Sequence, residues 1–125
     1  MAATFHNDVY DSGLNGGLKT VVENLYICSA QPTTFAEASS TYALGVKAAP
    51  AMTGPEAHTT GRKVTVSAIT DGTVTGTDTA TWFALTDDSA SKLLAAQELN
   101  AGQAVTSGNT FTLTACILAI PAPTA

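Results

Sequence analysis

The second half of the chain alternates apolar and polar residues in short runs, and each run ends at a turn signal. Between Arg62 and Ile120 these runs recur about every ten residues. Val64 and Val66 belong to one face of such a run and Thr65 to the other, because side chains alternate across a strand. Six or more short strands at this spacing predict a mainly β fold, an antiparallel β-sandwich or barrel.

The first turn in this half is predicted at Asp71-Gly72. An Asp-Gly pair favours a type I′ hairpin turn, because both central residues of that turn need a positive φ. Residues 62–70 would then be the outgoing strand and residues 73–77 a short return strand. We therefore expect these two segments to pair with each other.

Further strands follow, separated by turns at 87–90 and 107–109. They are predicted over residues 79–87, 92–99, 103–106 and 110–120. The last strand becomes wholly apolar from Ala115 to Ile120, a pattern typical of strands that are buried on both faces. Pro121 and Pro123 end it, and residues 121–125 form a tail.

Residues 1–24 predict a helical segment, because apolar residues recur there at a spacing of three to four. These residues are Phe5, Val9, Leu14, Leu18, Val21 and Val22. Gly13, Gly16 and Gly17 each weaken a helix by about 1 kcal/mol, so we expect the helix to be bent or interrupted there. It would cover one end of a sheet, or form an arm that reaches a neighbouring subunit.

Residues 25–29 predict a buried strand, and a long loop is expected over residues 32–60. That loop is rich in Pro, Gly, Ser and Thr, with one helical turn near Phe35 and a short strand that begins near Tyr42. Loops of this length tend to be functional or to lie against a partner. A length of 125 residues predicts a single domain over residues 1–125, with the β-sandwich in residues 25–120.

The composition excludes several classes of partner. Only 12% of the residues are charged, the net charge is −5, and 22 Ala and 21 Thr make up about a third of the chain. A phosphate-binding surface needs clustered cations, which this sequence lacks, so we expect no nucleic-acid partner. The start of the chain has no basic and apolar leader, and no run is long enough to span a membrane. The sequence thus predicts synthesis in the cytoplasm without a signal peptide and no membrane partner.

The residues offer no recognisable catalytic, cofactor-binding or metal-binding motif, and we expect no enzyme. His6 and His58 are the only histidines and lack metal-ligand spacing. Asp87-Asp88 resembles a fragment of a calcium loop but lacks the remaining ligand positions. The sequence leaves open that Glu23 with Glu37, or Glu56 with Glu98, forms a pair of glycosidase carboxylates. Glycan clefts, however, generally use aromatic platforms, and the chain has one Trp and three Tyr.

The two cysteines, Cys28 and Cys116, fit neither a disulfide framework nor a zinc site. The favoured interpretation is two buried thiols in strands. A Cys28–Cys116 disulfide and a disulfide to a neighbouring subunit both stay open, because an extracellular particle could oxidise either pair after leaving the cell.

Three segments carry a resemblance to a known group of proteins. They are residues 25–38 (LYICSAQPTTFAEA), 81–96 (TWFALTDDSASKLLAA) and 103–113 (QAVTSGNTFTL). Their order and turns resemble small structural proteins of tailed bacteriophages and prophages, over a stretch from about Phe5 to Ile120. The glycines at 13, 16 and 17 depart from the continuous N-terminal helix of that group.

The resemblance implies a virion structural protein, with the virion as its location. Within that group it implies a capsid decoration or cement protein that stabilises the head by binding the major capsid protein. The alternatives are a neck, tail or fibre adaptor, and a receptor- or glycan-binding β-sandwich. It further implies a homo-oligomer or contacts with other virion proteins. The candidate contact residues are Phe5, Val9, Leu14, Leu18, Phe35 and Tyr42.

Overall fold

A computed structural model describes residues 15–57 and 61–120, and these residues are mainly β. Their strands form two antiparallel sheets, and each sheet belongs to one of two compact units. The larger unit comprises residues 22–50 and 69–113. The smaller unit draws its described residues from 15–21, 51–57, 61–68 and 114–120.

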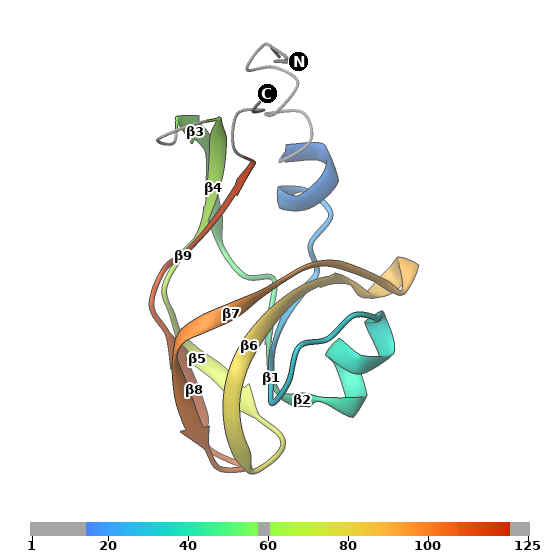
Figure 1. Ribbon diagram of the computed structural model, residues 1–125, viewed down its shortest axis with the longest axis vertical. Coiled ribbons are helices and arrows are strands. Elements are labelled where there is room, and N and C mark those ends of the chain that lie inside the picture. The colour runs from blue at the N-terminus through green and yellow to red at the C-terminus, as the bar shows by residue number, and fades with distance from the viewer. Residues whose placement is uncertain (1–14, 58–60, 121–125) are drawn as a thin grey trace, which may run out of the picture. The chain divides into compact units, whose positions relative to one another are not determined.

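The larger unit is built on a six-stranded sheet with the strand order β7-β6-β1-β2-β5-β8. The elements are β1 (Asn24–Cys28), η2 (Glu37–Thr41), β2 (Ala43–Ala48), β5 (Ile69–Val74), β6 (Asp78–Asp87), η3 (Asp88–Ala90), β7 (Lys92–Val105) and β8 (Thr110–Leu113). Every strand pair in this sheet is antiparallel. Strands β6 and β7 form a long, strongly curved hairpin that η3 closes (Figure 1).

The core of the larger unit lies on one face of its central strands. Leu25 and Ile27 of β1 have no exposed surface, and neither does Leu85 of β6, while Phe83 is 1% exposed. These four residues share a face because β1 and β6 pair Leu25 with Leu85 and Ile27 with Phe83. Burying side chains of this size contributes about 1.5–3 kcal/mol each, which makes this face the main source of stability.

Phe111 of β8 is buried in this core, and its position explains why residue 72 is a glycine. Its ring lies over Gly72, the residue opposite it in β5, where an added Cβ would come within 2.2 Å of the ring. A Cβ on Gly45 of β2 would also lie 3.1 Å from Phe111. Both glycines therefore give the ring a place against the sheet.

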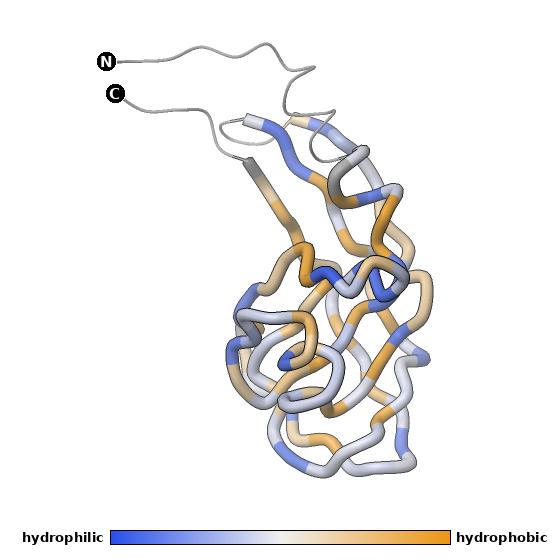
Figure 2. The backbone as a smooth tube through the Cα atoms, turned by 90° about the vertical axis from the view of Figure 1, so that its right-hand side faces the viewer, coloured by the Kyte–Doolittle hydropathy of each residue, from blue (hydrophilic) through white to orange (hydrophobic). Residues whose placement is uncertain are grey.

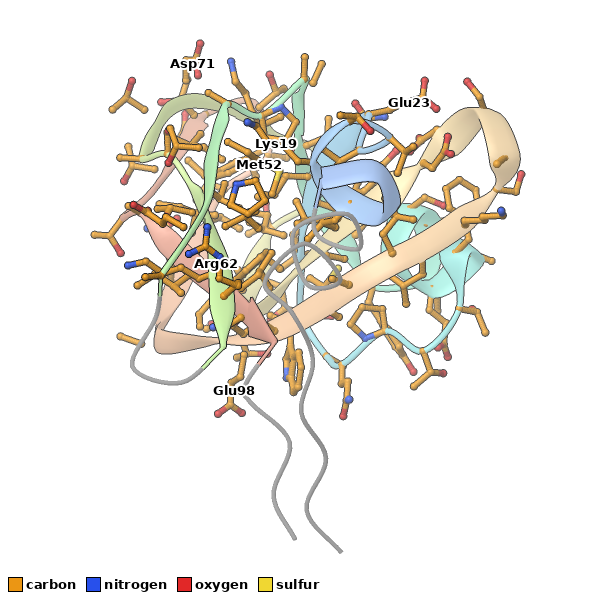
Figure 3. All side chains as sticks on the ribbon, turned by 90° about the horizontal axis from the view of Figure 1, so that it is seen from above. Lys19, Glu23, Met52, Arg62, Asp71 and Glu98 are labelled. Carbon is orange, nitrogen blue, oxygen red and sulfur yellow. The ribbon has the colours of Figure 1, made fainter. Side chains whose placement is uncertain are left out.

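The smaller unit contains a three-stranded sheet with the order β3-β4-β9. Its elements are η1 (Asn15–Lys19), β3 (Met52–Ala57), β4 (Arg62–Val66) and β9 (Cys116–Ile120). Lys19 donates a hydrogen bond of 2.7 Å from Nζ to the carbonyl oxygen of Gly54, which ties η1 to β3. Figure 3 shows Lys19 close to Met52, at the start of the same strand.

The predicted helix over residues 1–24 is not supported. Residues 1–14 lie outside the described residues, Asn15–Lys19 make a single helical turn, and Asn24 already begins β1. Gly16 and Gly17 within that turn are poor helix formers, and the β-branched Val21 and Val22 lead into the strand. For the described part of this pattern, the apolar spacing of Leu18, Val21 and Val22 thus comes from a turn followed by a strand.

The predicted hairpin at Asp71-Gly72 is wrong. Both residues lie within β5, which pairs with β2 and β8, whereas β4 pairs with β3 and β9. Gly72 serves the packing of Phe111 and not a turn. The Asp-Gly signal did not distinguish these two uses of a glycine.

The last predicted strand is divided, because residues 110–113 form β8 and residues 116–120 form β9, in different sheets. Its apolar end is not buried on both faces, since Ile117 is 42% exposed and Ala115 and Ala119 are also exposed. Figure 2 shows this apolar stretch as the hydrophobic length of tube that precedes the grey C-terminal trace.

The expected long loop over residues 32–60 is also wrong in extent, because η2, β2 and β3 lie within it. The helical turn and the short strand predicted inside it are confirmed as η2 and β2. The barrel alternative is wrong, because both sheets are open and have edge strands. The strands predicted over residues 25–29 and 79–87 are confirmed as β1 and β6. The strand predicted over residues 62–70 is confirmed only for residues 62–66, which form β4, because residues 69–70 begin β5 in the other sheet.

Candidate functional site

The second face of β1 and β6 is the part of the larger unit best suited to contact a partner. Tyr26 and Cys28 alternate with the core residues of β1, and the register places them opposite Ala84 and Trp82 of β6. Opposite residues share a face, so these four side chains lie on the side of the sheet away from Phe83.

Helix η2 packs on this face through Ala38. Ala38, Cys28 and Ala84 are fully buried together. Side chains that are only partly buried surround this contact, and we call them the aromatic surface: Tyr26, Tyr42, Trp82, Leu93 and Ala96. They come from β1, β6, β7 and the residue after η2, so segments far apart in the sequence build one surface.

Hydrogen bonds fix Tyr26 at the border of this surface. Its hydroxyl donates to Oδ2 of Asp88 at 2.7 Å, and the hydroxyl of the buried Thr86 donates to the other carboxylate oxygen of Asp88. Burial, followed by the hydrogen bond to Asp88, raises the pKa of Tyr26 to about 12. The ring therefore stays neutral and held in one orientation, which lowers the entropic cost of using it in a contact.

A second polar contact ties the start of β1 to the turn between β6 and β7. Glu23 accepts hydrogen bonds from the backbone N–H of Ser89 at 2.6 Å and from its hydroxyl at 2.9 Å. These bonds, the backbone one above all, lower the pKa of Glu23. The side-chain hydrogen bond with Glu23 is the largest cause that raises the pKa of Asp87, because that bond needs a proton on one of the two carboxyl groups.

Glu37 is held within its own segment. It accepts hydrogen bonds from the backbone N–H of Thr33 at 2.8 Å and from the Thr33 hydroxyl at 2.7 Å, and these bonds lower the pKa of Glu37. The polar partners of Glu23 are instead Ser89 and Asp87. The hydrogen bonds of these two carboxylates thus serve to fix turns.

The candidate contact residues fall into three groups. Phe35 and Tyr42 are half-buried on either side of η2, and Tyr42 belongs to the aromatic surface. Leu18 is buried in η1, with 8% of its surface exposed. Phe5, Val9 and Leu14 lie outside the described residues, as do His6 and His58. Contact through any of these residues stays a prediction.

Both cysteines lie in strands and carry free thiols. Cys28 is fully buried under η2, where its sulfur donates to the carbonyl oxygen of Ala38 at 3.6 Å, and burial raises its pKa to about 11. Cys116 in β9 is only half-buried, and burial raises its pKa as well. A disulfide to a neighbouring subunit stays a prediction.

The described residues contain no group of three or more His, Cys, Asp or Glu side chains that could hold a metal ion. Within the same ranges, no helix is long and apolar enough to cross a bilayer. Comparisons of the chain with protein-family models, with curated proteins and with solved structures found no match.

Sequence reasoning missed the aromatic surface itself. Counting one Trp and three Tyr argued against an aromatic platform, but Trp82 and two of the tyrosines meet on one face. The alternation in residues 81–86 does place Trp82 and Ala84 together. Nothing in the sequence indicated that β6 pairs with β1, and this pairing is what places Tyr26 on the same face.

Proposed function

We propose that this chain is a structural protein of a tailed-bacteriophage virion. In this proposal it acts as a decoration protein that binds the major capsid protein on the outside of the head, in many copies and without catalysis. It would reside in the virion and meet neighbouring copies of itself there. That the two sheets form a β-sandwich belongs to the same proposal.

The observation that carries the proposal is the aromatic surface. Four of its five residues come from the two segments, 25–38 and 81–96, that resemble phage structural proteins. Large, partly buried aromatic side chains are enriched where proteins contact each other, because they bury much area at a low cost in conformational entropy.

The scarcity of charge supports a protein partner over a charged one. Glu98 of β7 is exposed and lies opposite Trp82, and Lys92 is exposed opposite Asp87. Uncharged Ala, Leu and Thr make up most of the other residues of β6 and β7. Uncharged side chains of this kind lose little solvation free energy when another protein covers them. A stable contact still needs about 1,000 Å² or more, so the partner must cover more than the aromatic surface alone.

Copy number tests the proposal against the neck, tail and fibre alternatives. Quantitative gel densitometry of purified particles should give this chain a copy number that approaches that of the major capsid protein. A copy number at least about tenfold lower would replace the decoration role by a neck or fibre role, and its absence from particles would refute the virion assignment.

A binding experiment tests the surface itself. Particles depleted of this chain should recover it from solution, measured by co-sedimentation. We expect Tyr42→Ala, which truncates one residue of the aromatic surface, to weaken recovery about tenfold, which corresponds to about 1.4 kcal/mol. Leu113→Ala in β8 removes another half-buried apolar side chain and is the matched control. Equal recovery of both variants would argue against a contact at the aromatic surface.

The same surface favours glycan binding as a second candidate function, because Trp82, Tyr26 and Tyr42 pack around the same buried cluster. Trp82 is the only tryptophan, so its fluorescence reports on this surface alone. Titration with a panel of host-surface glycans should shift that fluorescence if a sugar stacks there. No change across the panel, together with binding to particles, would leave the capsid contact as the function.

A further inference from the structure

The four edge strands of the two sheets differ in how they are protected against pairing with another chain. Exposed edges carry unpaired N–H and C=O groups, and proteins protect them with charges, prolines, irregular pairing or short length. Edge strand β3 contains Pro55 and Glu56, and its pairing with β4 is irregular between Thr53 and Glu56. Edge strand β7 carries Lys92 and Glu98, and β8 has only four residues.

Strand β9 has none of these protections. Its sequence, Cys-Ile-Leu-Ala-Ile, is uncharged and contains no proline, and its five residues pair with β4 in an unbroken register. Within residues 15–57 and 61–120, β9 has no second strand partner. Among the described residues, Ile117 on this strand is the large apolar residue that is exposed, with 42% of its surface accessible to solvent.

The register with β4 assigns the two faces of β9. Cys116 and Leu118 lie opposite the buried Val66 and Val64, so they belong to the buried face. Ile117 lies opposite Thr65 on the other face, where it is exposed. A strand that adds to β9 must keep this alternation, with an apolar residue at each position that continues the buried face.

We propose that the free edge of β9 pairs with β9 of a second copy of this chain, antiparallel and about a two-fold axis at Leu118. The pairing would join two three-stranded sheets into one six-stranded sheet. It would place Ile117 opposite Ala119 of the second copy and bring the two Ile117 side chains within diagonal reach. This inference does not depend on the virion assignment.

A second copy fits this edge, because β9 itself supplies the apolar alternation that an added strand needs, and its lack of charge avoids repulsion there. Each copy carries a net charge of −5, so most of its surface repels another copy, whereas β9 brings no like charges together. The nearest cationic strand is β4, with Arg62 and Lys63. In the paired sheet the two copies of β4 would lie about 14 Å apart, beyond the Debye length of about 8 Å at physiological salt.

The size of the contact predicts a weak, reversible dimer. Five residues from each copy fall well short of the roughly 20–30 residues a side of a standard stable interface. Such a contact matters most where many copies are held close together, because a high local concentration compensates for low affinity.

Sedimentation velocity of the full chain over about 1 μM to 1 mM tests the proposal, under reducing conditions that exclude disulfides. We expect a concentration-dependent monomer–dimer equilibrium. Ala119→Lys adds a charge at the edge without removing a large apolar side chain. Ile117→Lys adds a charge and also removes the apolar contact of Ile117. Each should raise the dissociation constant about tenfold or more. Thr112→Lys, an exposed position on edge strand β8, is the charge-matched control and should leave the dimer unchanged.

Circular dichroism of each variant verifies that the sheets are retained. A wild-type chain that stays monomeric over the whole series would overturn the proposal. So would a dimer that both β9 variants leave intact, because its contact would then lie elsewhere. If Ile117→Lys alone disturbs the fold, Ala119→Lys still decides the outcome, since Ala119 is exposed and small.

Discussion

The two sheets of this chain use the same alternation of apolar and polar residues to different ends. The six-stranded sheet buries Leu25, Ile27, Phe83 and Leu85 almost completely on one face. Among the described side chains of the three-stranded sheet, Val64 and Val66 are buried to this degree, and Ile117 is exposed. The larger unit thus supplies its own core, whereas the described part of the smaller unit exposes an apolar side chain and gives β9 no second strand partner.

The largest expected effect is the loss of a core aromatic residue from the six-stranded sheet. Phe83→Ala should lower the free energy of unfolding by about 3–5 kcal/mol, because it removes a fully buried ring and leaves a cavity. Ile117→Ala in the other sheet should cost less than about 1 kcal/mol in dilute solution, since that side chain is already exposed. Chemical denaturation measures both, and similar losses for the two variants would break the contrast between the sheets.

The two thiols give the next contrast, because each lies in a different sheet. Cys116 should react with iodoacetamide at least about 100-fold faster than Cys28, whose sulfur is buried under η2 and becomes reachable only when the structure opens. Mass spectrometry of the native chain over time resolves the two sites. Equal rates would contradict the packing of η2, and a chain with no reactive thiol would restore the disulfide prediction.

The glycine under Phe111 predicts a smaller effect within the larger sheet. Gly72→Ala should destabilise the protein by about 1–3 kcal/mol, because the new methyl group would overlap the ring. Gly76→Ala is the matched control, since a Cβ there lies 3.4 Å from Leu44 at ordinary contact distance. A neutral Gly72→Ala would mean that Phe111 does not lie where the sheet register places it.

The ionisation of Tyr26 is the smallest and most local expectation. Its folded pKa of about 12 lies above the unfolded value of about 10. The stabilisation from the neutral ring is therefore complete below pH 10 and is lost as the pH rises through 12. Asp88→Asn should lower the pKa of Tyr26 only part of the way, because burial is the larger cause. Ultraviolet titration of the phenolate measures this, and an unchanged pKa would remove Asp88 as a partner.

The sequence was sufficient where a single strand explains its own pattern. The run 25–29 and the alternation in 79–87 identified β1 and β6, two interior strands of the six-stranded sheet. It failed where the cause lies in another strand: Gly72 accommodates a ring from β8, and the chain changes sheets between Leu113 and Cys116 without a proline or glycine there. The aromatic surface required the pairing of β1 with β6, which depends on tertiary structure and not on local propensity.

Hydrogen exchange at two protein concentrations tests the contrast between the sheets most directly. Backbone amides of β1 and β6 should be protected equally at low and high concentration, because their pairing is internal to the larger unit. Amides of β9 that face away from β4 should gain protection only at high concentration, when the edge of one copy meets the edge of another. Equal protection of these outward amides at both concentrations would contradict the account, because the edge would then be either covered within the single chain or left unpaired between copies.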